Sequence, residues 1–169
     1  MKMQKSTLAH LEAIMSIIDD AQKHLASLNI DQWQDGYPSE EQIKLDIENN
    51  DSYIVIDEAE KIIGTTVFTT TLEPTYNKIE GKWLTEGNTK YGVIHRLAVS
   101  DDYRKSGFAR FVFDYCEKKL IEQRITSMRI DTHKDNIGMQ GLLKKMGYKY
   151  CGVIILTSGA ERLAFEKVF

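Results

Sequence analysis

Residues 93–110 read VIHRLAVSDDYRKSGFAR, which gives a strand, a turn and the start of a helix in succession. Residues 93–99 are mostly aliphatic on both alternating faces, as is typical of a central strand covered on both sides. Residues 100–103 are polar turn formers. Beyond them, apolar residues recur at helical spacing, at Phe108, Phe111, Val112, Tyr115, Cys116 and Leu120. The stretch therefore predicts a strand, a tight turn and a helix.

The entrance to this helix has the chemistry of an anion-binding site. The first turn of a helix leaves backbone N–H groups without partners, and the helix dipole is positive there. Gly107 allows a phosphate to come close to the backbone, while Arg104 and Lys105 add positive charge. We expect the turn to seat a phosphate or a pyrophosphate. The alternative is a generic strand–turn–helix unit with a glycine at its turn.

The turn sequence, Arg-Lys-Ser-Gly-Phe-Ala, resembles the Arg/Gln-x-x-Gly-x-Gly/Ala signature of the GNAT superfamily of N-acetyltransferases. Its position between an apolar strand and an amphipathic helix makes the match more specific. The resemblance implies that the pyrophosphate of acetyl-CoA is bound by Arg104, Lys105, Ser106, Gly107, Phe108 and Ala109. It also implies that the pantetheine arm is bound by a splayed strand at Leu97, Ala98 and Val99.

A second match to the family lies further along the chain. Asn136, followed by Gly147 and Tyr148, resembles the family's Asn…Tyr…Gly-Phe motif. By this analogy Asn136 binds the pantetheine or a neighbouring loop, although it is also a suitable helix N-cap and can do both. The family's usual general acid is a tyrosine at the position where this chain has Leu143. Either Tyr148 or another tyrosine replaces it, or the thiolate leaves unaided, or the protein is a weak catalyst.

His95 is the candidate general base for the acyl transfer that the resemblance implies. An alkylamine, with a pKa of about 10, arrives protonated and cannot attack a thioester until a base removes its proton. His95 lies on the predicted strand, and a free histidine pKa of about 6.5 suits proton removal near neutrality. The arylalkylamine branch of the family has a histidine at this place. The alternative is a core histidine satisfied by the backbone.

Residues 33–38 read Trp-Gln-Asp-Gly-Tyr-Pro and combine aromatic residues with turn-forming residues. The region after the first helix often lines the acceptor site in GNAT proteins, which implies substrate-binding roles for Trp33 and Tyr37. An equal alternative is that both rings plug the edge of the core. Residues 73–90 show little periodicity and either cover the site or wander over the surface.

Composition narrows the class of protein. The chain of 169 residues has 42% hydrophobic and 28% charged residues, which predicts one globular domain over residues 1–169. A net charge of −3 argues against a nucleic-acid partner. Cys116 and Cys151 cannot form a disulfide framework, and no Cys or His cluster supports a metal site. The absence of a long apolar run argues against a membrane span or signal peptide, so we expect a cytoplasmic protein.

These observations predict an α/β domain built on a mixed, mostly antiparallel sheet of six or seven strands, with helices on both faces. The resemblance implies acetyl-CoA-dependent N-acetylation of a primary amine on a small molecule or peptide, without a metal. A homodimer is compatible with the family. The rival function is a non-catalytic acyl-CoA-binding module. A nucleotide-phosphate binder ranks last, because the turn lacks the Gly-Lys-Ser/Thr of a P-loop.

Overall fold

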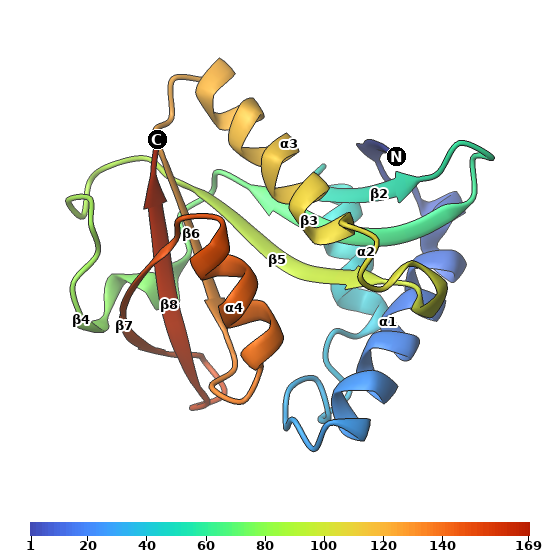
Figure 1. Cartoon of the computed structure of the whole chain (residues 1–169), viewed down its shortest axis with the longest axis horizontal. Helices are drawn as coiled ribbons and strands as arrows, with labels where there is room; N and C mark the ends of the chain where they lie inside the picture. The colour runs from blue at the N-terminus through green and yellow to red at the C-terminus, as the bar shows by residue number, and fades with distance from the viewer. The chain divides into compact units, whose positions relative to one another are not determined.

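The computed structural model describes every residue from Met1 to Phe169 and is a mixed α/β fold (Figure 1). The strands are β1 (Lys2–Lys5), β2 (Ser52–Ile56), β3 (Ile62–Thr69), β4 (Ile79–Gly81), β5 (Gly92–Val99), β6 (Ser127–Thr132), β7 (Lys149–Ile155) and β8 (Glu161–Val168). The α-helices are α1 (Leu11–Ser27), α2 (Glu40–Glu48), α3 (Phe108–Glu122) and α4 (Ile137–Lys145). Single 3₁₀ turns form η1 (Leu8–His10), η2 (Pro74–Asn77) and η3 (Asp101–Tyr103).

The strands pair in the order β1-β2-β3-β5-β6-β8-β7-β4. Strands β5 and β6 are parallel, whereas β1–β2, β2–β3, β6–β8, β7–β8 and β4–β7 are antiparallel. The predicted mixed, mostly antiparallel sheet is therefore confirmed. The predicted count of six or seven strands is wrong, because there are eight. The short strand β4 has only three residues and ends at Gly81, which is too little for an alternating pattern to be recognised.

The chain forms two compact units. The first consists of Met1–Phe68 with Ile94–Tyr115, and the second of Thr69–Val93 with Cys116–Phe169. Strand β5 and helix α3 each contribute residues to both units. The predicted phosphate turn, His95 and the aromatic loop at Trp33 belong to the first unit.

In the first unit, the β2–β3 hairpin is covered by helices on both faces. Ile54 and Ile56 pack with α1 and α2 in one apolar cluster. Val55 and its register partner Gly64 face the opposite side, because successive side chains alternate. A Cβ at position 64 would lie 2.2 Å from the ring of Phe108, so the start of α3 rests directly on β3. This contact fixes where the predicted phosphate turn leaves the sheet.

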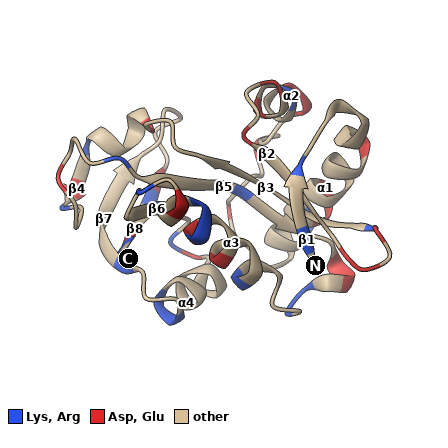
Figure 2. Cartoon of the chain, turned by 90° about the horizontal axis from the view of Figure 1, so that it is seen from above, with Lys and Arg blue, Asp and Glu red and all other residues tan.

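Helix α2 is short, and its charged residues are mostly acidic (Figure 2). The hydroxyl of Ser39 accepts a hydrogen bond from the amide of Gln42 at 3.2 Å and so caps the start of the helix. Glu40 and Glu41 occupy the first turn, where the helix dipole favours negative charge. Lys44 is the one cation of the helix.

In the second unit, the core is formed by aromatic and aliphatic side chains: Tyr76, Trp83, Tyr91, Val93, Cys151, Ile154 and Ala164. Two of these, Tyr76 and Trp83, come from the segment of low periodicity, and Tyr91 directly follows it. The rings of Tyr76, Trp83 and Tyr91 are 2%, 8% and 2% exposed. Most other residues of 73–90 are exposed, so this is a surface segment, as predicted, but Tyr76 and Trp83 anchor it to the core.

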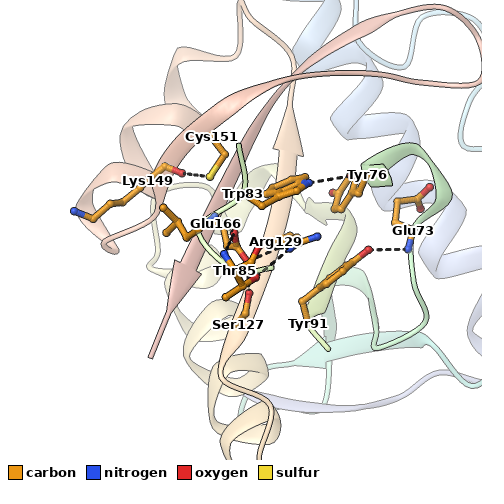
Figure 3. Close-up of polar contacts among 11 residues, drawn as sticks. Glu73, Tyr76, Trp83, Thr85, Tyr91, Ser127, Arg129, Lys149, Cys151 and Glu166 are labelled. Carbon is orange, nitrogen blue, oxygen red and sulfur yellow. Dashed lines mark hydrogen bonds and ion pairs between the residues drawn. The ribbon is translucent and has the colours of Figure 1, made fainter. Parts of the chain in front are cut away.

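A buried ion pair lies within the same core (Figure 3). Arg129 of β6 and Glu166 of β8 are register partners, and Arg129 Nε lies 3.1 Å from Glu166 Oε1. Their side chains are 3% and 0% exposed. The guanidinium carbon of Arg129 lies 4.3 Å from the ring centroid of Trp83 and 4.1 Å from that of Tyr91. Cation–π contacts of this kind stabilise a desolvated arginine.

The carboxylate of Glu166 accepts several further hydrogen bonds. They come from the hydroxyls of Ser127 and Thr85 and from the amides of Leu84 and Thr85. Burial works to raise the pKa of Glu166, but the bonds from Ser127, Thr85 and Arg129 outweigh it and hold the pKa below its ordinary value. The pair thus fastens the chain that follows β4 onto β6 and β8.

None of the helices combines enough length with enough apolar side chains to span a bilayer.

Candidate functional site

The predicted phosphate turn lies between β5 and α3 and is sharply bent. Lys105 and Gly107 have φ angles of +61° and +85°, so two of three consecutive residues are left-handed. This conformation has no steric penalty for glycine but disfavours other residues. A Cβ built at position 107 would meet nothing within 4 Å. The backbone at Gly107 therefore faces open space, as a phosphate seat requires.

The first turn of α3 also leaves backbone amides without partners inside the helix. The amide of Phe111 donates to the carbonyl oxygen of Gly107 at 3.0 Å, which begins the helical pattern. The amides ahead of it have no carbonyl of the helix to accept their hydrogens. Phe108, at 3% exposure, anchors this first turn on Gly64. The residues present therefore fit a phosphate group, through main-chain donors on a fixed helix end.

The two predicted cations of the turn differ in their surroundings. Arg104 Nε donates to Asp101 Oδ1 at 2.8 Å, and its Nη2 donates to the same carboxylate. Nη2 also donates to the carbonyl oxygen of Asp20 on α1 at 3.3 Å. Lys105 is exposed. Arg104 therefore ties the turn to α1, which leaves Lys105 as the better placed of the two to meet an anion.

Strand β5 departs from an extended conformation beside the candidate base. Arg96 has a φ of +53°, which is uncommon for a residue other than glycine. His95 is half-buried, and its carbonyl oxygen accepts a hydrogen bond from Thr66 Oγ1 at 3.2 Å. Ala98 packs in the cluster of α1 and α2, whereas Leu97 and Val99 are half-buried.

The two aromatic residues predicted for the acceptor side have different environments. Trp33 is half-buried and packs against the apolar cluster of α1 and α2, which agrees with the interpretation as a core plug. Tyr37 is 38% exposed, and its hydroxyl accepts a hydrogen bond from Arg96 Nη1. A hydrogen bond to Arg96 therefore connects Tyr37 to the strand that carries His95, whereas Trp33 packs against the apolar cluster that includes Ala98 of the same strand.

A buried pair beside Tyr37 was not predicted from the sequence. Arg96 Nη2 donates to Asp46 Oδ1 at 2.6 Å, and the two side chains are 12% and 6% exposed. Burial works to lower the pKa of Arg96, but Tyr37 and Asp46 outweigh it and the pKa is raised. One signal was available, because Asp46 falls between Ile43 and Ile47 on the buried face of α2. A charged residue at such a position needs a partner.

The second family motif lies in the second unit. Asn136 is the N-cap of α4, since its side chain accepts a hydrogen bond from the amide of Met139 at 3.1 Å. Leu143 is fully buried. Tyr148 is 3% exposed, and its hydroxyl donates to Glu117 Oε1 at 3.0 Å. The hydroxyl hydrogen of Tyr148 is therefore already engaged in a hydrogen bond to a carboxylate, which makes Tyr148 a poor replacement for the missing acid.

The chain is similar to a known protein family and to curated sequences. The model of the Acetyltransferase (GNAT) family matches residues 18–148. An acetyltransferase from Yersinia pestis (strain Pestoides F) is 34% identical over 65 residues, which are 38% of this chain and 46% of that protein. The match thus spans about half the length of the curated relatives.

Solved structures are similar over almost the whole chain. A GNAT family acetyltransferase from Streptococcus agalactiae is 32% identical, with a TM-score of 0.87, and the match covers 99% of this chain and 95% of that one. One from Listeria monocytogenes has a TM-score of 0.78 with 99% and 94% coverage, but at 18% identity it shows the fold alone. The family model, the first of these structures and the turn at Gly107 agree, and the chain belongs to the GNAT family of acetyltransferases.

Proposed function

We propose that this acetyltransferase moves an acetyl group from acetyl-CoA to a primary amine of a small molecule or a peptide. The observation that carries the proposal is the exposed, left-handed turn at Gly107, with open space in front of its backbone. Main-chain amides at the start of α3 would hold the diphosphate, and Lys105 would add a positive charge. The bound thioester supplies an activated acetyl group. The protein's own task is then to orient the amine and to remove its proton.

His95 is the proposed general base. It lies on β5, directly before the left-handed residue Arg96, and its carbonyl is fixed by Thr66. In this role its side chain takes a proton from the ammonium form of the acceptor, directly or through water. The acidic helix α2 belongs to the same unit and would favour a cationic amine over an anionic substrate. A thiol with a pKa of about 8.5 can leave as the thiolate, so no protein acid is assigned.

Ligand binding is tested by thermal unfolding. At about 100 times its Kd, acetyl-CoA should stabilise the protein by about 2.7 kcal/mol. For a chain of this length that corresponds to a rise in Tm of roughly 5–10 °C. ATP at the same concentration should give a much smaller shift, because the turn lacks a P-loop lysine. Equal stabilisation by ATP would overturn the assignment to acetyl-CoA.

Catalysis is tested separately by the release of free CoA in the presence of phenethylamine, putrescine and a peptide with a free N-terminus. Thiol release that depends on one of these amines supports the proposed transfer. Tight binding of acetyl-CoA without release across a broad panel of amines would instead favour the non-catalytic acyl-CoA-binding module.

His95→Gln should lower kcat about 100-fold and leave the Kd of acetyl-CoA unchanged, because the side chain acts on the amine proton. The loss should be smaller at high pH, where more of the amine is already neutral. His10→Gln, which makes the same change on η1 of the same unit, is the matched control and should keep full activity. A normal kcat for His95→Gln would remove this residue from the mechanism.

A further inference from the structure

We infer that Asp46 and Arg96 are positioning residues, which hold the ring of Tyr37 at the amine site and thereby set which amine is accepted. The three residues come from α2, from β5 and from the loop between α1 and α2. Arg96 joins them, since Nη2 donates to Asp46 and Nη1 donates to the hydroxyl of Tyr37. The positioning role rests on the proposed function, because it concerns the acceptor of that reaction.

The hydrogen bonds of the ion pair are arranged so that Arg96 can also hold Tyr37. Arginine and carboxylate side chains commonly pair through two parallel hydrogen bonds. Here Arg96 contacts Asp46 through Nη2 alone, at 2.6 Å, and Nη1 goes to Tyr37. Asp46 Oδ1 accepts a second bond from Gln42 Nε2 at 3.0 Å, while Asp46 Oδ2 and Arg96 Nε are buried without a hydrogen-bond partner. A pair that served only stability would use these atoms.

The position of the pair gives a second argument. Buried ion pairs are weak stabilisers, because desolvation offsets the attraction between the charges. Arg96 also holds a left-handed conformation, and it is the direct neighbour of the candidate base His95. Backbone strain of this kind concentrates at functional sites, where the surrounding structure enforces it. The desolvation of a buried charge and the strained backbone conformation are therefore both found at Arg96, the residue that contacts Tyr37.

The backbone of the Tyr37 loop is held independently of Arg96. Gln22 Nε2 of α1 donates to the carbonyl oxygen of Tyr37 at 2.9 Å, and the amide of Tyr37 donates to Asp35 Oδ1 at 3.2 Å. Gln34 Nε2 donates to the carbonyl oxygen of Gln22 at 3.1 Å. Weakening the Asp46–Arg96 pair should therefore loosen the tyrosine ring without releasing the loop.

The experiment compares Asp46→Asn, Tyr37→Phe and the double variant with the wild type. Each single change should raise the KM for the best amine about tenfold, with little change in kcat and none in the Kd of acetyl-CoA. The ranking of phenethylamine, putrescine and the peptide should also change. The double variant should be no worse than the worse single one, because both changes break the same connection. Glu48→Gln, the same loss of charge at an exposed position of α2, is the matched control.

Amine affinity is also measured by calorimetry on the protein saturated with CoA, so that an inactive protein still gives an answer. Amine binding without turnover would overturn the proposed transfer but would leave the positioning role standing if Asp46→Asn binds more weakly than the wild type. Unchanged amine affinity and an unchanged ranking of the amines in Asp46→Asn would overturn the positioning role, even if the variant has a lower Tm. Additive effects of the two changes on the KM for the amine would also overturn the positioning role.

Discussion

Replacing Gly107 with glutamate should weaken acetyl-CoA binding at least about 100-fold. The new side chain would enter the open space in front of the helix amides and place a carboxylate where a diphosphate is expected. Two unit charges about 4 Å apart repel by about 4 kcal/mol at an effective dielectric of about 20. If solvent reduces this to roughly 2.7 kcal/mol, the Kd still rises about 100-fold. Calorimetry gives the Kd, and the Tm shift with acetyl-CoA should disappear.

Two variants at the same position separate charge from backbone strain. Gly107→Ala and Gly107→Gln both put an L side chain at a φ of +85°, which costs about 1–2 kcal/mol of stability. Neither adds a charge, so each should retain much tighter binding than Gly107→Glu. Wild-type affinity in Gly107→Glu would mean that the phosphates bind elsewhere. Equal loss in Gly107→Gln and Gly107→Glu would mean that shape, and not charge, excludes the ligand.

Glu166→Gln should destabilise the protein by about 3–5 kcal/mol, because Arg129 would remain buried without its counter-charge. The two side chains are 0% and 3% exposed, so water cannot replace the lost partner. The amide of glutamine would also bring an N–H₂ group among donors from Ser127 and Thr85, which need an acceptor. Chemical denaturation with an unchanged m value would measure the loss.

Glu161→Gln, at an exposed position of the same strand, is the matched control and should change stability by less than about 0.5 kcal/mol. A double variant with Leu at positions 129 and 166 should be more stable than Glu166→Gln, because neither charge remains. Equal stability of Glu166→Gln and Glu161→Gln would contradict the account of the ion pair.

The stability contributed by Glu166 should also depend on pH. Its folded pKa lies below the ordinary value of 4.5, so the contribution is complete above that value. It should be lost as the pH falls through the lower, folded pKa. Glu166→Gln should therefore be closer to the wild type in stability at acidic pH than at neutral pH.

Local chemistry made the turn predictable from the sequence. The order of apolar strand, polar turn, glycine and amphipathic helix is complete within residues 93–110, and it needs no knowledge of distant contacts. The left-handed conformation of Gly107 is one that glycine adopts without steric penalty. The N-cap roles of Ser39 and Asn136 were predictable for the same reason.

Contacts between distant residues made the other features unpredictable. Arg96 and Asp46 lie on a strand and a helix far apart in the sequence, and periodicity does not say which charged residues meet. The left-handed φ of Arg96 contradicts its setting among strand-forming residues. The aromatic anchors Trp83 and Tyr91 both contact Arg129, which is distant in the sequence, so no local periodicity marks them. In each case tertiary contacts override the local preference.

The path of the chain through the two compact units has a consequence for synthesis on the ribosome. The chain crosses from one unit to the other after Phe68, after Val93 and after Tyr115, so no single proteolytic cut could release either unit whole. A nascent chain that ends at Phe68 lacks β5 and the start of α3, and at roughly 5–20 residues per second it waits some seconds for them. During that interval the β2–β3 hairpin has one uncovered face, where a chaperone could bind.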